Sequence, residues 1–225
     1  MNTICPLCHA PDEKISPIEG RLQRRYLHCA ACQLIFTHPD DLPQRDEERT
    51  RYEEHENTIE APGYVKFLNQ AIDPTLPLLS ADMTGLDYGS GPGPTLSQLL
   101  ARQGIRCLDY DPIFGPALPK GPFDFIFSTE TFEHFHHPAT EMDRIDQLLK
   151  PGGYLTIMTM FRPALEEFPK WFYPGDYTHV TFFNLETFEF ICRNWNYQYL
   201  WDDGKRVIIL KKLMIDWAML QAMKY

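Results

Sequence analysis

Short apolar runs of strand length alternate with helical patterns through residues 84–212 of the 225-residue chain. Two stretches between the runs, PTLSQLLARQG and ATEMDRIDQLLK, repeat their apolar residues at helical spacing. Strands that alternate with helices predict an α/β fold with a parallel, doubly wound sheet. The runs with the length and apolar content of strands are GLDYG, IRCLDYD, FDFIFS and GYLTIMTMF.

The residues after the fourth strand continue this pattern. NLETFEFICRNW predicts a helix, for which Asn184 is a suitable N-cap. YQYLWDD and RVIILKK predict two strands paired as a terminal hairpin. We therefore assign residues 81–212 to one domain.

The end of the chain has a helical pattern of its own. Leu213, Trp217 and Leu220 recur at helical spacing. We expect residues 213–225 to form a helical tail. This tail either packs on the domain or makes the contact between two chains of a homodimer.

Residues 39–80 connect the N-terminal segment to the large domain. Their first half is rich in charge and bounded by prolines, which predicts a linker with one short helix. GYVKFLNQAI then predicts a helix that packs on the domain. Tyr52, His55 and Asn57, in RYEEHEN, belong either to a solvated helix or to a lid over a bound ligand.

Four of the six cysteines lie in residues 1–38 as two pairs, CPLC and CAAC, with 20 residues between the pairs. Two such turns at this separation can present four thiolates to one metal ion. We therefore predict a small zinc ribbon whose closed Zn²⁺ site is structural, with iron as the alternative metal. The predicted ligands are Cys5, Cys8, Cys29 and Cys32.

Charge and composition narrow the range of partners. The chain has 21 Lys and Arg against 31 Asp and Glu, and its net charge of −10 disfavours nucleic acid and anionic lipid as partners. No apolar run is long enough to cross a membrane, and MNTICPLCHA lacks the basic and apolar regions of a signal peptide. We therefore expect a soluble, cytoplasmic protein whose reduced thiols are available for metal binding.

A glycine-rich turn follows the first predicted strand. Gly89, Gly91 and Gly93 occupy alternate positions, as expected where a backbone turns sharply or approaches a ligand. A dinucleotide fingerprint needs G-x-G-x-x-G, and Pro94 stands where its third glycine belongs. Asp111 ends the second strand, where a carboxylate can accept hydrogen bonds from ribose hydroxyls. These features alone fit either a dinucleotide or another nucleotide cofactor.

Later motifs distinguish these cofactors. FDFIFSTETFEHFHHP followed by LLKPGGYLTIMT resembles, in order and spacing, the later motifs of class I S-adenosylmethionine-dependent methyltransferases, and LDYGSGPG resembles their first motif. The resemblance covers roughly Thr84 to Met160. The cysteine ribbon with RYEEHEN and the downstream DYTHVTFF resemble a bacterial subfamily of zinc-ribbon methyltransferases. The resemblance implies a Rossmann-like sheet and S-adenosyl-L-methionine as cofactor.

The resemblance also implies roles for individual residues. Asp87 and the glycine turn would border the methionine part of the cofactor. Asp111 would hold its ribose, with Asp109 as the alternative if the alignment slips by one residue. The residues after the FDFIFS strand would lie near the sulfonium and the acceptor. The implied cofactor-binding set is Asp87, Gly89, Ser90, Gly91, Gly93, Asp111, Pro112, Ser128, Thr129 and Glu130.

The chain departs from the family pattern after Asp111. Only the eleven residues PIFGPALPKGP, four of them prolines, lie where the family has a helix and a third strand. We therefore expect the sheet to lack that edge strand. Pro112, Ile113 and Phe114 would then lie beside the adenine.

Methyl transfer requires alignment of donor and acceptor, and it requires a base only when the acceptor keeps its proton. GDYTHVTFF, after the last parallel strand, is the best source of such a base. His179 is the predicted catalytic base, supported by Tyr177 and Tyr173; the alternative is that His179 only braces its loop. Four residues are expected to be structural, Glu133 and His134 in a turn and His136 and His137 in an exposed loop.

The leading functional hypothesis is a methyltransferase that acts on a small-molecule acceptor. One alternative is an RNA methyltransferase that contacts RNA through the ribbon, although the ribbon's basic cluster is small. Another is a binding module that keeps the nucleotide pocket without chemistry and docks a protein partner through the ribbon. The basic cluster comprises Lys14, Arg21, Arg24 and Arg25.

Overall fold

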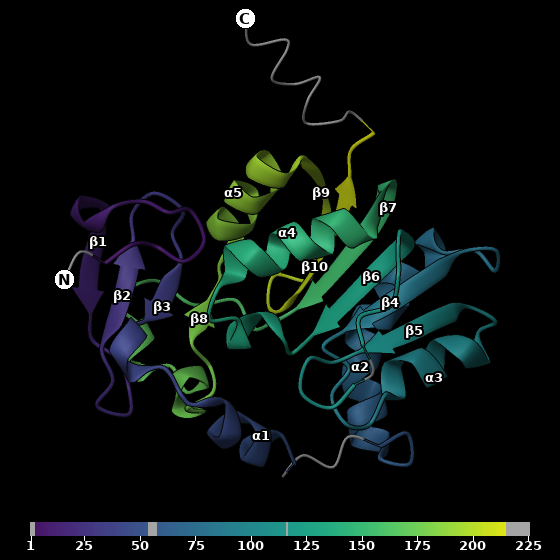
Figure 1. Cartoon of the computed structure of the whole chain (residues 1–225), viewed down its shortest axis with the longest axis horizontal. Helices are drawn as coiled ribbons and strands as arrows, with labels where there is room; N and C mark the ends of the chain where they lie inside the picture. Colours follow the sequence, from purple (N-terminus) through teal and green to yellow (C-terminus); the bar gives the residue numbers. More distant parts are fainter. Residues whose placement is uncertain (1–2, 54–57, 116, 215–225) are drawn as a thin grey trace, which may run out of the picture.

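The central sheet has six strands in the order β5-β4-β6-β7-β10-β9 (Figure 1). The computed structural model describes residues 3–53, 58–115 and 117–214. The first four strands in this order are parallel, and the predicted terminal hairpin adds the last two in antiparallel orientation. The strands are β4 (Thr84–Tyr88), β5 (Arg106–Tyr110), β6 (Phe123–Thr129), β7 (Leu149–Met158), β9 (Tyr197–Asp202) and β10 (Val207–Lys212).

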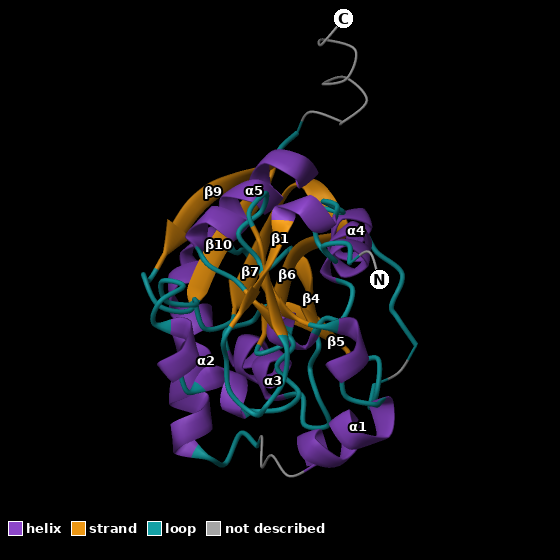
Figure 2. Ribbon diagram, turned by 90° about the vertical axis from the view of Figure 1, so that its left-hand side faces the viewer, coloured by secondary structure: helices purple, strands orange, loops and turns teal. Residues whose placement is uncertain are grey.

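Helices cover both faces of the sheet, as expected for a doubly wound fold (Figure 2). One face carries α2 (Pro62–Thr75) and α3 (Thr95–Arg102), and the other carries α4 (Pro138–Leu148) and α5 (Leu185–Trp195). Each pair of helices contributes its apolar side to a separate core cluster, one on each side of the sheet. The predicted α/β fold is therefore confirmed.

The central strand β6 shows why the sequence folds in this way. Phe125 and Phe127 point into the core under α2 and α3, whereas Ile126 points into the core under α4 and α5. All three side chains are fully buried. A strand covered on both faces must be apolar at successive positions, and this explains the unbroken FDFIF run.

Local signals set the ends of two helices. Asn184 caps α5, because its Oδ1 accepts a hydrogen bond from the amide of Thr187 at 3.0 Å. Gly104 follows α3 at a φ of +74°, in the left-handed region that glycine adopts without strain. Both signals were visible in the sequence.

The edge of the sheet at β5 agrees with the shortened sequence that follows it. In the described part of the chain, β5 pairs with β4 and with no strand beyond. After β5 the chain turns at once, and the amide of Gly115 donates to the carbonyl of Asp111 at 2.9 Å. The predicted absence of the third strand is therefore confirmed, because so few residues leave no length for a crossover.

The N-terminal region forms a second, four-stranded sheet. Its strands β1 (Ile15–Ile18), β2 (Tyr26–Cys29) and β3 (Ile35–Thr37) form an antiparallel ribbon. The fourth strand, β8 (Thr181–Phe182), comes from the large domain and pairs with β3. The ribbon predicted as the separate module 1–38 therefore shares a sheet and a continuous core cluster with the domain. Its short strands supply too few apolar residues for a core of their own.

The remaining elements are short. The linker carries the predicted short helix, α1 (Arg45–Glu53). No helix in the described residues is both long and apolar enough to span a bilayer. His55, Asn57 and all but the first two residues of the predicted C-terminal tail lie outside the described residues. The 3₁₀ turns are η1 (Asp12–Lys14), η2 (Pro39–Asp41), η3 (Leu76–Leu78), η4 (Phe132–His134), η5 (Phe168–Lys170) and η6 (Tyr173–Gly175).

Phe182 on β8 tests whether ribbon and domain fold together. Its fully buried ring packs between Tyr26 of the ribbon and Phe168 of the domain, with ring centroids 5.9 and 5.2 Å away. We expect Phe182→Ala to lower the free energy of unfolding by about 3–5 kcal/mol in urea titrations, with one transition for the whole chain. Phe172→Ala, at a site 61% exposed, is the control and should change little. Two separate transitions would show independent units.

Candidate functional site

A cavity of about 1090 Å³ opens at the carboxyl ends of β4, β5 and β6. Parallel strands end at the same edge of a sheet, so the loops after these strands meet there. Side chains of α1 and α2 also line the cavity. The predicted site residues in its lining are Asp87, Gly89, Ser90, Gly91, Asp111, Pro112, Thr129, Glu130 and His179.

The glycine turn lies against β5. The amides of Gly89 and Ser90 donate to the carbonyl of Tyr110 at 2.7 and 3.0 Å. Gly89 and Gly91 have φ values of +88° and +65°, which only glycine adopts without strain. A Cβ on Gly89 would lie 2.4 Å from the side chain of Thr131, so this position also lacks space for a larger residue. The turn leaves backbone, rather than side chains, at the cavity wall.

Asp111 connects the glycine turn to the loop after β5. Its Oδ1 accepts hydrogen bonds from the amides of Ile113 and Phe114 at 2.8 and 3.0 Å. Its Oδ2 accepts from the amide of Gly91 at 2.9 Å. Asp109, the alternative position in the sequence, lies outside the cavity lining. Of these two aspartates, Asp111 is therefore the one whose carboxylate lies at the cavity.

Four predicted site residues, Gly93, Ser128, Tyr173 and Tyr177, lie outside the lining. Gly93 belongs to the glycine turn. Ser128 is fully buried and donates its hydroxyl to the carbonyl of Tyr88 at 3.0 Å, so it connects β6 to β4. Tyr177 is 38% exposed and donates its hydroxyl to the carbonyl of Glu47, on α1, at 2.9 Å. The side chains of Ser128 and Tyr177 therefore connect elements of secondary structure and do not face the cavity.

Two carboxyl groups at the cavity, the buried Asp87 and the half-buried Glu130, have raised pKa values. Burial, and then the charge of Asp109, raises the pKa of Asp87 well above its usual range. Burial, and then the neighbouring Glu133, raises the pKa of Glu130 to about 9. Asp87 Oδ1 and Glu130 Oε1 have no hydrogen-bond partner among the described residues. The surroundings therefore favour the neutral acid at both positions unless a cation is nearby.

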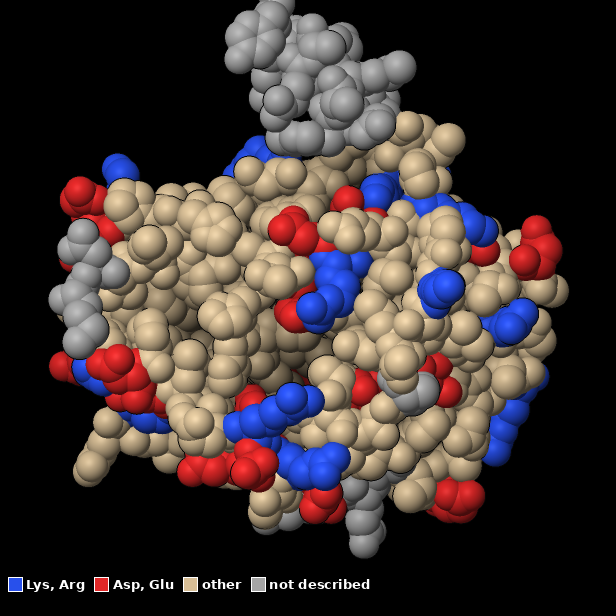
Figure 3. All heavy atoms as spheres, in the orientation of Figure 1, with Lys and Arg blue, Asp and Glu red and all other residues tan. Residues whose placement is uncertain are grey.

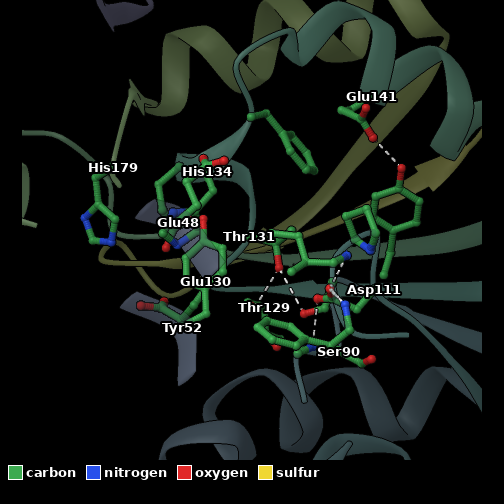
Figure 4. A pocket seen from close by; sticks show the side chains of 18 of the residues that line it. Glu48, Tyr52, Ser90, Asp111, Thr129, Glu130, Thr131, His134, Glu141 and His179 are labelled. Atoms are coloured by element: carbon green, nitrogen blue, oxygen red, sulfur yellow. Dashed lines mark hydrogen bonds between the residues drawn. The ribbon is translucent and has the colours of Figure 1, made fainter. Parts of the chain in front are cut away.

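Two of the histidines that line the cavity, His134 on η4 and His179 in the loop before β8, lie together at the end away from Asp111 (Figure 4). Their ring centroids are 4.9 Å apart. Nδ1 of His134 lies 2.9 Å from the carbonyl oxygen of Thr178, and Nδ1 of His179 lies 2.8 Å from that of Tyr173. A carbonyl can only accept, so each Nδ1 carries the proton and each Nε2 carries a lone pair. Burial, and then the nearby His134, lowers the pKa of His179 to about 4.

Glu133 is closely associated with these histidines. Its side chain is fully buried, and its Oε1 accepts a hydrogen bond from the hydroxyl of Tyr173. Its Oε2 has no partner in the described part of the chain. Its carbonyl accepts from the amide of Val180 at 2.7 Å, which fixes the distance between the η4 turn and the loop before β8. The sequence suggested only a structural role for this turn, but its polar groups face the cavity.

Helix α1 lines the cavity and contacts the loop after β5. Arg45 and Arg49 donate to the carbonyls of Pro112 and Ile113, both at 2.8 Å. The guanidinium of Arg49 also lies over the ring of Phe114, 5.3 Å from its centroid. The side of the helix that carries Arg45 and Arg49 is thus attached to the loop after β5.

A different side of α1 contacts the loop before β8 and the segment after η4. Arg51 pairs with Asp176 at 2.9 Å, and Glu48 pairs with His136 at the same distance. His136 was expected in an exposed loop, but it is half-buried because α1 packs over it. Glu48 and Tyr52, four residues apart, face the cavity. In the sequence, this four-residue spacing was the signal that could have indicated a lid. Of the three residues proposed for a lid, only Tyr52 lies in the described part of the chain.

The four ribbon cysteines converge as predicted. The Sγ atoms of Cys5 and Cys32 lie 3.5 Å apart, as do those of Cys8 and Cys29. All four lie within 4.8 Å of one another, and none forms a disulfide. Tetrahedral coordination with Zn–S bonds of about 2.3 Å separates the sulfurs by about 3.8 Å. The donor set therefore fits Zn²⁺ with little rearrangement.

Sequence comparison places most of the large domain in one family. A family model described as a methyltransferase domain matches residues 60–200. An 87-residue segment is 34% identical to the ubiquinone biosynthesis O-methyltransferase of Nitrosococcus oceani, and it covers 37% of this chain and 36% of that protein. The alignment thus spans about a third of the relative's length.

Solved structures share the fold at low sequence identity. The 1,6-didemethyltoxoflavin-N1-methyltransferase of Burkholderia thailandensis, solved with 1,6-didemethyltoxoflavin and S-adenosylhomocysteine, matches with a TM-score of 0.51 and 17% identity over 88% of this chain and 99% of that chain. A candidate S-adenosyl-L-methionine-dependent methyltransferase of Methanococcus maripaludis matches with a TM-score of 0.50 and 20% identity over 76% of this chain and 94% of that chain. At these identities the similarity establishes a common fold.

The ion pair between Arg51 and Asp176 tests how firmly α1 is held over the cavity. We expect Arg51→Ala to accelerate amide hydrogen exchange in residues 45–53 about fivefold, which corresponds to about 1 kcal/mol of local opening free energy. Arg193→Ala, which removes an exposed pair with Glu189, is the matched control and should leave α1 unchanged. Equal exchange in Arg51→Ala and the wild type would show that the pair does not hold the helix.

Proposed function

This chain belongs to the S-adenosylmethionine-dependent methyltransferases, and we propose that it transfers the methyl group of S-adenosyl-L-methionine to a small-molecule acceptor. One observation carries the proposal. A single cavity of about 1090 Å³ contains the glycine turn and Asp111 at one end and Glu130, His134 and His179 at the other (Figure 4). This volume accommodates a nucleoside-sized cofactor and a small acceptor together.

At the cofactor end, the backbone of Gly89, Ser90 and Gly91 would border the methionine part, with Asp87 beneath it. The support is electrostatic. Asp87 is 2% exposed and has no cationic partner among the described residues. A buried carboxylate is costly without a compensating charge, and the ammonium and sulfonium groups of the cofactor would supply it. Gly93 and Ser128 would act indirectly, by shaping the turn and connecting its strands.

Asp111 would hold the ribose. A carboxylate offers about four lone-pair sites, and three are occupied by backbone amides. One further donor, a ribose hydroxyl, can therefore bind without the loss of a loop contact. Pro112 to Phe114 would then form the wall beside the adenine, with Arg49 covering Phe114 from outside.

In the transfer step, a lone pair of the acceptor forms a bond to the methyl carbon while the carbon–sulfur bond breaks and its electron pair stays on sulfur. The residues supply alignment and exclude water. Thr129 and Glu130 would lie beside the reacting atoms. His179 would face the acceptor proton through Nε2, and Tyr177 would act only as a positioning residue, through its bond to α1.

The charges around the cavity support a small-molecule acceptor. Glu48, Glu130, Glu133 and Asp176 all line the end of the cavity with the histidines, which is the proposed acceptor side. Basic and acidic side chains are interspersed on the face shown in Figure 3. Neither feature suits a nucleic-acid backbone, so a small molecule is favoured over RNA. The O-methyltransferase described above supports oxygen as the methylated atom.

The cofactor assignment is tested by calorimetry with S-adenosylhomocysteine. We expect binding by the wild type and an affinity at least 10-fold lower for Asp111→Asn, about 1.4 kcal/mol, because the amide loses the charge that attracts the ribose donor. Asp73→Asn, at an exposed carboxylate outside the cavity lining, is the control and should bind like the wild type. No binding by the wild type would overturn the proposed function.

The ribbon is proposed to hold one structural Zn²⁺. We expect one zinc per chain by elemental mass spectrometry, and its loss in Cys29→Ser. The Tm should fall by roughly 10 °C, because metal loss removes several kcal/mol of folding free energy. Cys192→Ser, at a half-buried cysteine far from the cluster, is the control. Full zinc content in Cys29→Ser would exclude the four-thiolate site.

A further inference from the structure

Glu133, His134 and His179 form a second group with metal-ligating atoms, separate from the cysteines. They come from η4 and from the loop before β8, and each offers one ligand atom within 4.8 Å of the others. All three line the acceptor half of the cavity. In the cofactor assignment above, none of them has a role. Their convergence therefore calls for an explanation of its own.

The orientation of both imidazoles suits metal binding. Each Nδ1–H donates to a backbone carbonyl, of Thr178 for His134 and of Tyr173 for His179. Such a bond fixes the tautomer and directs the Nε2 lone pair away from the backbone. Histidines that bind metals commonly have this support from their other nitrogen. Two neighbouring histidines with the same arrangement point to one shared ligand.

The carboxylate gives a second, independent observation. Glu133 is fully buried, and only its Oε1 has a partner, the hydroxyl of Tyr173. Oε2 is unpartnered among the described residues. An unpaired buried carboxylate oxygen is costly, and one nitrogen of each imidazole lies within 4.8 Å of an oxygen of this carboxyl group. A cation bound between the three groups would satisfy all of them.

We propose that Glu133, His134 and His179 bind one divalent transition-metal ion at the acceptor end of the cavity. Two imidazole nitrogens and one carboxylate oxygen are a donor set for Mn²⁺, Fe²⁺, Co²⁺, Ni²⁺ or Zn²⁺. Three protein ligands leave open positions on the ion, in contrast to the closed site of four thiolates. Tyr173 is the positioning residue that orients Glu133.

The role of this ion rests on the proposed function. A hydroxyl of the acceptor would bind an open position, where the metal lowers the pKa of the hydroxyl. The proton passes to water, the oxygen then forms the bond to the methyl carbon, and the electron pair of the carbon–sulfur bond stays on sulfur. His179 would thus act on the acceptor through the metal and not as a direct base. The acceptor class is a molecule with a hydroxyl that can bind a metal.

The test measures Mn²⁺ binding to the full chain with its ribbon loaded with Zn²⁺, by calorimetry and by the electron paramagnetic resonance of bound Mn²⁺. We expect one equivalent for the wild type. The affinity should fall more than about 10-fold in His134→Ala, His179→Ala and Glu133→Gln, and about 10-fold or more in Tyr173→Phe, which leaves the ligands intact. His137→Ala, at an exposed histidine on the same segment, should bind like the wild type.

Absence of a Mn²⁺ equivalent in the wild type would overturn the proposal, as would binding that persists in both histidine variants. In either case the cluster would be a hydrogen-bonded carboxylate–histidine group. S-adenosylhomocysteine binding, measured on the same samples without Mn²⁺, separates this result from the proposed function. Retained nucleotide binding without Mn²⁺ binding rejects the metal site alone. Near-wild-type nucleotide binding by Glu133→Gln also shows that this variant is folded.

Discussion

Burying a carboxylate without a cationic partner costs free energy, and the described part of this chain does so twice around one cavity, at Asp87 and Glu133. These buried groups lie where three parallel strands end, which is also where ligands of α/β proteins bind. Asp87 faces the proposed cofactor end, and Glu133 faces the two histidines. The cavity is thus prepared for positive charge at both ends. We propose that a sulfonium nucleotide supplies this charge at one end and a metal ion at the other.

The ribbon contributes to this cavity through backbone hydrogen bonds. The amide of Thr37 donates to the carbonyl of Val180 at 2.8 Å, and the amide of Val180 donates to the carbonyl of Glu133 at 2.7 Å. A continuous path therefore leads from β3 of the ribbon to the acceptor side. A metal bound by the ribbon would therefore also stabilise the position of His179, which lies next to Val180 in the chain. The ribbon and the end of the cavity that holds the histidines are in this way parts of one folded unit.

The sequence predicted most elements of the fold because their signals are local. The Phe125–Phe127 run indicated a strand buried on both faces, and Asn184 indicated the start of α5. The missing edge strand followed from chain length alone, since residues 112–122 leave no room for a crossover. Nothing in the sequence indicated that β8 completes the ribbon's sheet, because a two-residue strand has no periodicity to detect.

The sequence by itself determined the candidate site residues of each local motif: the cysteine pairs, the glycine turn and the acid after β5. Local spacing fixes these, because each motif lies in one short stretch of chain. Only the tertiary structure decided that Glu133 and His134 meet His179, and that α1 connects the loop after β5 to Asp176. These contacts join residues 40 or more positions apart. Their geometry depends on how the sheets pack, and no short pattern in the sequence encodes it.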